Sequence, residues 1–304
     1  MSEAATHEHA ANSVGALVNE VREVLHSARI EDAKTEARDL VAAVLEMPRL
    51  WPSTHRDELT ETPARDAALA AARKRASGAP FAYAVGRAAF RHFVLEVDER
   101  VLIPRQETEV LVDAVLERMR EGVAIDIGTG SGAIALALAS EGAYERVIAI
   151  DVSLGALEVA RTNARRLARG LRTPVEFRHG SLLAPVRGER ARVIVSNPPY
   201  IAIGEAPELP SSVRDWEPPI ALFSGADGMS ITARIIRQAA DVLERGGLLA
   251  LELDSRRASA AAELALGCGM YTDVSVRLDL AGRERILLAT RVAYHEASDS
   301  ETTS

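Results

Sequence analysis

The sequence predicts an α/β protein in which a helical domain and a β-hairpin precede a Rossmann-like, mostly parallel sheet. Apolar residues recur at helical spacing within the first 85 residues. From residue 105 onward, short apolar strands alternate with longer amphipathic helices, as in consecutive βαβ units. A glycine-rich turn follows the first of these strands, where a doubly wound sheet binds its ligand. A length of 304 residues agrees with two domains.

The order of these patterns sets the expected domain boundaries. We expect a helical domain over 13–85, a hairpin linker over 86–104 and an α/β domain over 105–294. The polar segments 1–12 and 295–304 are expected to be disordered tails, because they contain too little apolar surface to form a core.

The helical domain is predicted to contain three amphipathic helices, near 14–25, 37–45 and 63–76. Pro63 suits the first turn of the third helix, where its missing N–H costs nothing. The hairpin follows from Phe90, where polar and apolar residues begin to alternate. We expect its turn at Asp98 and Glu99 and its end at Pro104.

The α/β domain is predicted to form seven strands and five long helices. The strands lie near 123–127, 147–151, 174–178, 192–196, 247–253, 272–278 and 285–291, and the helices near 107–121, 132–141, 154–169, 229–245 and 255–266. The last two strands follow each other through a turn around Gly282, without a helix between them. This arrangement predicts a parallel sheet that ends in an antiparallel strand.

Composition disfavours several classes of protein. A net charge of −8 disfavours a protein whose main partner is nucleic acid, and we interpret the arginine-rich stretch 161–172 as a solvated helix face. No apolar run reaches the ~18–20 residues of a membrane span, and the first residues do not resemble a signal peptide. A single cysteine excludes internal disulfides and multi-cysteine metal sites. We therefore expect a cytoplasmic monomer without a metal ion or membrane contact.

The glycine-rich turn points to a specific class of cofactor. Gly128, Thr129, Gly130, Ser131 and Gly132 follow a strand that ends near Asp126. Dinucleotide sites use the longer spacing G-x-G-x-x-G, which aims a helix N-terminus at a pyrophosphate. The tighter spacing here favours a nucleoside without a phosphate, such as S-adenosylmethionine, over NAD. The alternative is a strand-to-helix turn that binds no ligand.

An acidic residue ends the second predicted strand of the sheet. Asp151 reaches the same sheet edge as the glycine turn, and its carboxylate can accept hydrogen bonds from both hydroxyls of a ribose. The alternative is that Asp151 caps the next helix. Ser153 can serve as that cap instead, which would leave Asp151 free for the ligand.

The segment SNPPY, at the end of the fourth strand, contains the candidate catalytic residues. Two prolines end the strand, and Asn197 and Tyr200 flank them. An amide nitrogen is a poor nucleophile, and acceptors at the Asn197 side chain and the Pro198 carbonyl would orient it and stabilise its developing charge. Tyr200 could pack against the planar group. The alternative is that the segment only terminates the strand.

These motifs together resemble the class I, S-adenosylmethionine-dependent methyltransferases that act on planar amino groups. The segments EARDLVAAVLEM, GAPFAYAVGRAAF, VLIPRQETEVLVD, DWEPPIALFSGADGM and DLAGRERILLA further resemble the release factor glutamine N5-methyltransferases, the PrmC/HemK family. The resemblance implies methylation of the glutamine side chain in the Gly-Gly-Gln loop of peptide chain release factors, with S-adenosylhomocysteine as the product. It also implies that 105–294 is the methyltransferase domain and that 13–85 recognises the substrate.

The resemblance assigns site residues by position. Gly128–Gly132, Asp151, Ser181, Leu182 and Asn197 would contact the cofactor, and Asn197, Pro198, Pro199 and Tyr200 would bind the substrate amide, with Asn197, Pro198 and Tyr200 as the catalytic group. The sequence departs from the family pattern at three places. Gln106 stands where the family has proline, Ser181 where it has an acidic residue, and Asp254 where it often has glycine.

Four other functions compete with this interpretation. A nucleic-acid amino methyltransferase would share NPPY, but the acidic charge and the lack of a target-recognition domain weigh against it. A methyltransferase for a ribosomal-protein glutamine cannot be separated by NPPY alone. A non-catalytic scaffold is disfavoured by the intact glycines, Asp151 and Asn197, and an NAD-dependent dehydrogenase by the loop spacing.

Overall fold

The computed structural model describes residues 12–293, so the predicted tails lie outside the described residues apart from Asn12. The chain forms two compact units. The first contains the residues up to Ala88 together with Glu96–Glu99 and Leu209–Glu217. The second contains Ala89–Leu95, Arg100–Glu208 and the residues from Pro218 onward. The assignment of Leu209–Glu217 to the first unit has no signal in the sequence periodicity.

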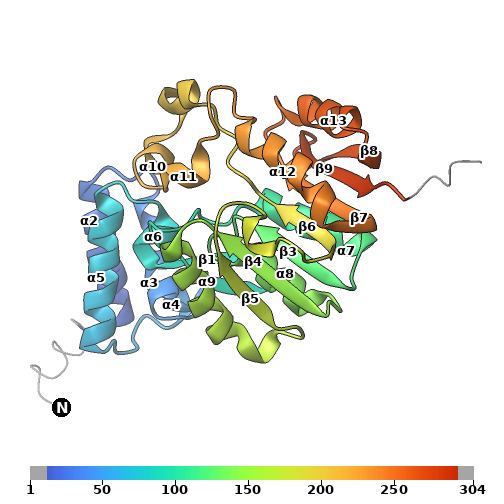
Figure 1. The fold of residues 1–304 in the computed structure, drawn as a ribbon. Helices are drawn as coiled ribbons and strands as arrows, with labels where there is room; N and C mark the ends of the chain where they lie inside the picture. Colours follow the sequence, from blue (N-terminus) through green and yellow to red (C-terminus); the bar gives the residue numbers. More distant parts are fainter. Residues whose placement is uncertain (1–11, 294–304) are drawn as a thin grey trace, which may run out of the picture. The chain divides into compact units, whose positions relative to one another are not determined.

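The first unit is built from the three predicted helices and three shorter ones. These are α2 (Val14–Ser27), α3 (Ala33–Val44), α5 (Thr62–Ala76), α4 (Trp51–Thr54), α6 (Phe81–Val85) and α10 (Ser211–Arg214) (Figure 1). The apolar faces of the three long helices form one buried core, which includes Leu17, Leu40 and Ala68. Small alanine side chains line the buried face of α5, so the helices can pack closely.

The two-stranded hairpin lies earlier in the chain than predicted. Its strands are β1 (Arg87–Phe90) and β2 (Phe93–Glu96), so the turn falls at Arg91 and His92 rather than at Asp98 and Glu99. Arg91 adopts a left-handed φ of 53°, which a tight hairpin turn requires and which usually selects glycine or asparagine. Its backbone N–H donates to Glu109 and its guanidinium pairs with Glu141. These contacts stabilise the left-handed backbone at Arg91, although arginine is not a residue type that predicts a turn.

The second unit contains a seven-stranded sheet in the order β5-β4-β3-β6-β7-β9-β8. The strands are β3 (Val123–Ile127), β4 (Arg146–Asp151), β5 (Val175–His179), β6 (Ala191–Ser196), β7 (Leu243–Glu252), β8 (Tyr271–Leu278) and β9 (Glu284–Arg291). The strands β3 to β7 are parallel to one another, whereas β9 runs antiparallel to both β7 and β8. This result confirms the predicted fold class and its antiparallel strand.

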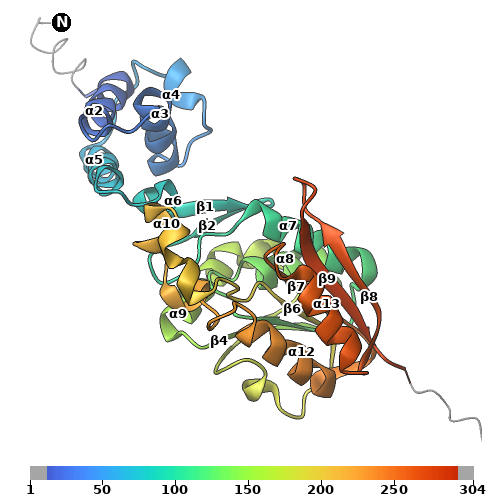
Figure 2. The same cartoon turned by 90° about the horizontal axis from the view of Figure 1, so that it is seen from above.

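Helices cover both faces of the sheet (Figure 2). The cores on the two faces place α7 (Gln106–Arg118) and α8 (Ala133–Glu141) on one side, and α12 (Ser230–Val242) and α13 (Ala258–Gly267) on the other. The unit also contains α9 (Leu154–Leu167), α11 (Pro219–Leu222) and the short 3₁₀ helices Ala168–Gly170, Ala184–Val186 and Ile203–Glu208. Alternate residues of the central strands contribute to the two cores, which explains their continuous apolar sequences.

The strand order reverses between β3 and β6. The chain passes from β3 outward to β4 and β5, and then crosses back to add β6 on the other side of β3. The helices that follow two such strands lie on opposite faces, so a crevice opens beyond the carboxyl ends of the strands. Asp151 is the last residue of β4 at this edge, and the glycine turn and Asn197 directly follow β3 and β6 there. Within residues 12–293, no helix combines the length and the apolar character needed to cross a bilayer.

Replacement of Gly132 by alanine is expected to destabilise the second unit. Gly132 has a φ of 86°, and an added Cβ would lie 3.2 Å from Ala160 Cβ and from Leu136 Cδ1. Strain and overpacking together predict a loss of about 1–3 kcal/mol in the free energy of unfolding, measured by urea denaturation. Gly170→Ala is the control, because an added Cβ there faces open space. Equal stability of the two variants would contradict the packing role.

Candidate active site

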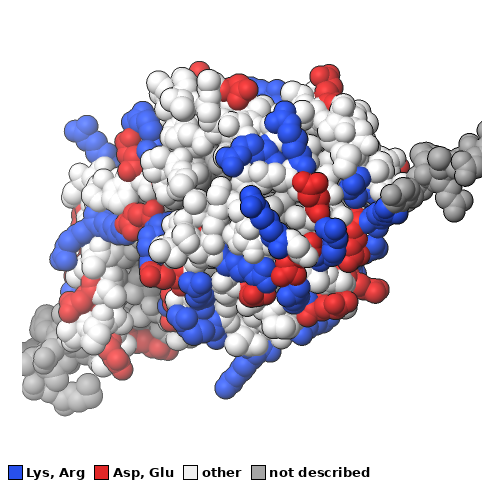
Figure 3. Space-filling model, in the orientation of Figure 1, with Lys and Arg blue, Asp and Glu red and all other residues white. Residues whose placement is uncertain are grey.

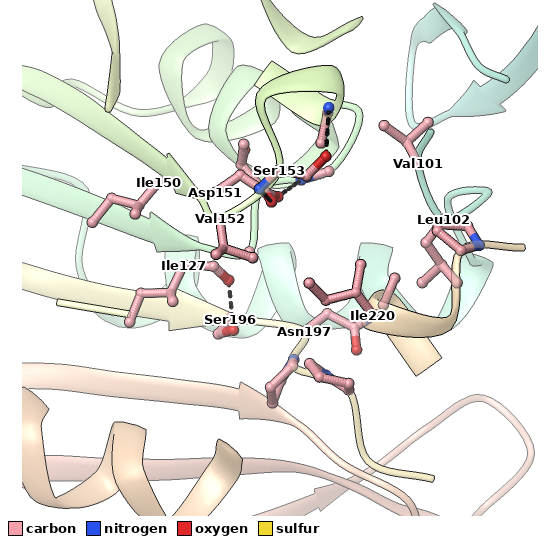
Figure 4. Close-up of a pocket in the computed structure, with 18 of the residues that line it drawn as sticks. Val101, Leu102, Ile127, Ile150, Asp151, Val152, Ser153, Ser196, Asn197 and Ile220 are labelled. Carbon is pink, nitrogen blue, oxygen red and sulfur yellow. Dashed lines mark hydrogen bonds between the residues drawn. The ribbon is translucent and has the colours of Figure 1, made fainter. Parts of the chain in front are cut away.

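One cavity of about 330 Å³ lies at the carboxyl ends of the central strands of the second unit. Figure 4 shows Ile127, Ile150 and Ser196 near the carboxyl ends of three adjacent strands. Asp151 and Asn197 directly follow Ile150 and Ser196 in the sequence. The predicted site residues that line this cavity are Gly128, Thr129, Gly130, Ser131, Asp151, Ser181, Leu182, Asn197, Pro198 and Pro199. Gly132 and Tyr200 do not belong to the described lining. Sequence positions spread over 70 residues are thus brought together in one place.

The glycines of the turn serve two different purposes. Gly128 and Gly130 have φ values of 72° and 55°, and a Cβ at either position would meet no atom within 4 Å. Their backbone therefore borders open cavity space, and their lack of a side chain leaves that space to a ligand. Gly132, by contrast, packs against α9 and supports the start of α8. The N–H groups of Gly128 and Thr129 donate to the Ile150 carbonyl and fix the turn against β4.

Asp126 fixes the turn from the interior of the protein. Its Oδ2 accepts a 2.6 Å hydrogen bond from the Thr129 hydroxyl and a 3.2 Å bond from the Ala135 N–H. Its Oδ1 has no hydrogen-bond partner in the described chain. Complete burial raises the pKa of Asp126 to about 7, because the charged form is poorly solvated there. The acidic residue before the glycines is therefore a support of the turn.

Asp151 is held by the backbone on both sides. Its Oδ2 accepts the Gly130 N–H at 2.9 Å and its Oδ1 accepts the Ser153 N–H at 2.8 Å. Ser153 caps α9 through the Ala156 N–H, as predicted, but Asp151 is not free of other contacts. Burial raises the pKa of Asp151, although these N–H groups partly oppose the shift. A carboxylate has about four lone-pair sites, so Asp151 keeps the capacity to accept a further hydrogen bond from a hydroxyl of a ligand.

Ser181 and Leu182 follow β5 and border the same cavity. Ser181 is exposed and can accept one hydrogen bond, whereas the backbone of Leu182 adopts a left-handed φ of 51°. This conformation is rare for a leucine and is found where surrounding contacts hold a strained segment in place. The nearly buried Leu182 side chain adds an apolar wall to the cavity.

The SNPPY segment continues directly from β6. The Ser196 hydroxyl donates to the Ile127 carbonyl at 2.6 Å and links the end of β6 to the end of β3. The Asn197 Nδ2 donates to Thr108 Oγ1 at 3.1 Å. Tyr200 is partly buried, and burial together with the Glu252 carboxylate raises its pKa. Its predicted contact with a substrate amide stays a prediction, because the cavity lining does not include it.

Two segments outside the predicted site complete the cavity. Residues before and within α7 contribute Leu102, Arg105 and Thr108, and the segment around α11 contributes Pro218, Ile220 and Phe223. Figure 4 shows Leu102 and Ile220 beside the cavity. Both segments belong to the stretches whose sequence resembles the PrmC/HemK family. Hydrophobic periodicity and motif spacing alone, however, do not assign a role to their residues.

The structure accounts for two of the three departures from the family pattern. Gln106 is the exposed first residue of α7, a position that suits proline but does not require it. The Asp254 Oδ1 accepts hydrogen bonds from the backbone and the guanidinium of Arg256, and so stabilises the turn between β7 and α13. Glycine at this position would make neither of the side-chain contacts.

The cavity fits S-adenosylmethionine by its shape and its chemistry. The turn offers backbone without side chains, and Asp151 offers acceptors for a ribose. Apolar side chains from Ile127, Ile150 and Val152 line the space between them. No group of three or more His, Cys, Asp or Glu side chains suited to a metal ion occurs among the described residues.

Comparison with known proteins gives the family. The PrmC N-terminal domain matches residues 16–86, and the Methyltransferase small domain matches residues 106–208. The release factor glutamine methyltransferase of Moorella thermoacetica is 46% identical over 221 residues, which cover 72% of this chain and 77% of that protein. That of Rhodopirellula baltica is 38% identical and covers 84% of this chain and 89% of its own. The chain belongs to the release factor glutamine methyltransferase family.

A solved structure shares the fold of this chain. The hMettl16 catalytic domain superposes with a TM-score of 0.50 over 79% of this chain and 85% of its own, at 17% sequence identity. The resemblance to the PrmC/HemK family and the predicted class I methyltransferase sheet are thus confirmed.

Loss of the Asp151 carboxylate is expected to weaken binding of S-adenosylmethionine. Asp151→Ala removes a charged acceptor and releases the Gly130 N–H that it holds. Hydrogen bonds to a charged group contribute about 1.5–3 kcal/mol, so calorimetric titration should show a dissociation constant raised by about 10–100-fold. Asp241→Ala, at an exposed position on α12, is the control. Unchanged affinity in Asp151→Ala would remove this residue from the cofactor site.

The raised pKa of Asp126 predicts that its contribution to the free energy of unfolding decreases as the pH rises. Its folded-state pKa is raised from 3.8 to about 7, so its stabilising contribution is present below pH 4 and is lost as the pH rises to about 7. Asp126→Asn should remove about 2–4 kcal/mol from this pH-dependent change in the free energy of unfolding. Urea denaturation of both proteins between pH 4 and pH 8 measures the difference. Parallel pH profiles would contradict the assignment.

Proposed function

We propose that the protein transfers the methyl group of S-adenosylmethionine to the side-chain amide nitrogen, N5, of the glutamine in the Gly-Gly-Gln loop of peptide chain release factors. The observation that carries the proposal is the position of SNPPY. Asn197 and Pro198 border the same cavity as the glycine turn and Asp151. The curated relatives named as release factor glutamine methyltransferases support this choice of substrate.

The two halves of the cavity have separate tasks. Gly128, Gly130 and Asp151 would hold the cofactor, which supplies an electrophilic methyl group and leaves as S-adenosylhomocysteine. Asn197 and Pro198 would hold the glutamine amide. The amide NH₂ has two hydrogens, and the Asn197 Oδ1 and the Pro198 carbonyl would each accept one.

These two acceptors would compensate for the weak nucleophilicity of the amide nitrogen. The nitrogen lone pair is delocalised into the carbonyl, and attack requires the nitrogen to pyramidalise and gain positive charge. Acceptors that are already in place stabilise this charge without reorganisation. The nitrogen then gives up one of its protons to water, so no side chain needs to act as a strong base before transfer.

We further propose that residues 13–85 recognise the release factor. The match of the PrmC N-terminal domain over 16–86 supports this role, since it is a separate domain characteristic of the family. Basic and acidic side chains are interspersed on the face of the molecule in Figure 3, in keeping with a protein substrate rather than a nucleic acid. Action as a cytoplasmic monomer without direct nucleic-acid contact stays a prediction.

The proposed activity can be tested directly. The purified protein is incubated with isotope-labelled S-adenosylmethionine in three separate reactions. The first contains a release factor, the second a mixture of ribosomal proteins and the third RNA. Mass spectrometry of the digested product locates the label. A methyl group on the glutamine of the Gly-Gly-Gln tryptic peptide is the expected result. Label on RNA or on a ribosomal-protein glutamine, with an unmodified release factor, would contradict the proposal.

Asn197→Ala is expected to abolish most methyl transfer while leaving cofactor affinity nearly intact. Removal of one preorganised electrostatic partner lowers turnover by about 10²–10³-fold. A release factor assay gives turnover, calorimetric titration gives cofactor affinity, and thermal unfolding reports on stability. If turnover stays within a few-fold of wild type, or falls only in proportion to lost folding, SNPPY has a structural role alone.

A further inference from the structure

A chain of hydrogen bonds begins at Asn197 in the cavity wall, passes through Thr108 and ends at the buried carboxylate of Glu252. The Asn197 Nδ2 donates to Thr108 Oγ1 at 3.1 Å, and the Thr108 hydroxyl donates to Glu252 Oε2 at 2.6 Å. Thr108 is 4% exposed and Glu252 is 1% exposed. The three residues come from the end of β6, the first turn of α7 and the last residue of β7, and lie up to 144 positions apart in the sequence.

The charge of Glu252 determines the direction of this chain. An ionised carboxylate can only accept hydrogen bonds, so the Thr108 hydroxyl must donate its single proton to Glu252. Thr108 Oγ1 can then offer Asn197 only a lone pair. The Asn197 NH₂ group must therefore face Thr108, and its Oδ1 is left for the cavity.

We propose that Thr108 and Glu252 are positioning residues that hold the Asn197 side chain with its oxygen toward the substrate amide. The inference rests on the proposed function, because Asn197 Oδ1 is the acceptor that the substrate NH₂ requires. A flipped Asn197 would present an NH₂ group to the substrate NH₂ group, and two donors repel each other. The methyl acceptor would then lose one of its two fixed contacts.

The surroundings of Glu252 make its charge sensitive to pH. Arg105 and Glu107 approach it from the start of α7, Arg285 from β9, and Tyr200 from the segment after β6. Burial outweighs the two arginines and raises the pKa of Glu252 to about 7. A protonated Glu252 can donate to Thr108, and Thr108 can then donate to Asn197 Oδ1. Protonation therefore permits the reversed chain and the flipped amide.

Three variants test the positioning role through activity on the release factor. Thr108→Val removes the acceptor for Asn197 Nδ2, and we expect kcat to fall about ten-fold while KM changes less than about two-fold. Thr108→Ser keeps the hydroxyl and should restore most of kcat. Thr173→Val is the matched control, because Thr173 is also 4% exposed and donates to a buried carbonyl, that of Tyr144, outside the cavity. Equal kcat in Thr108→Val and Thr173→Val would overturn the proposal.

The pH profile supplies a second readout that a purely structural role would not change. The wild-type kcat should rise with a midpoint near pH 7. It should be about ten-fold lower at pH 6 than at pH 8, because Glu252 is mostly protonated at pH 6. Glu252→Gln cannot ionise and should lose this dependence. A profile with the same midpoint in both proteins would contradict the role of Glu252.

Nuclear magnetic resonance of the Asn197 side-chain amide separates this inference from the proposed function. The signal is assigned by its loss in Asn197→Ala. It should shift with a midpoint near pH 7 in the wild type and stay constant in Glu252→Gln, whether or not the protein methylates a release factor. An Asn197 signal that does not respond to pH in the wild type would overturn the chain, and inactivity of the wild type alone would overturn only the proposed function.

Discussion

The site depends on the reversal of strand order between β3 and β6, because this reversal opens the crevice at the carboxyl edge of the sheet. The Ser196 hydroxyl, which donates to the Ile127 carbonyl, joins the two strand ends at this point. The glycine turn leaves β3 on one side of the crevice and SNPPY leaves β6 on the other. Both segments therefore border the same cavity.

Buried carboxylates support both walls of the crevice. Asp126 holds the glycine turn through Thr129, and Glu252 holds Asn197 through Thr108. Burial raises the pKa of each carboxylate to about 7, so their ionisation near neutral pH lowers the stability of the fold. In the proposed mechanism, ionisation of Glu252 also orients the Asn197 amide toward the substrate. Under that proposal, the stability of the fold and the activity have opposite pH preferences at this residue.

Local patterns in the sequence predicted most of the sheet and many of the residues that line the cavity. The strands β3, β4 and β6 have nearly continuous apolar sequences, and the glycine spacing is a local signal, so both can be predicted without knowledge of tertiary contacts. The hairpin turn at Arg91 was missed because ion pairs, rather than turn residues, hold its left-handed backbone. Thr108 and Glu252 were missed because their contact spans 144 positions and no motif joins them.

In the proposed mechanism, the Asn197 Oδ1 and the Pro198 carbonyl hold a glutamine amide beside the methyl donor. A crystal structure of the protein with S-adenosylhomocysteine and a peptide containing the Gly-Gly-Gln sequence can show this contact. We expect the glutamine nitrogen to lie within hydrogen-bond distance of both oxygens, on the side of the cavity opposite Asp151. A peptide glutamine bound elsewhere, or an Asn197 amide with its nitrogen toward the substrate, would refute this mechanism.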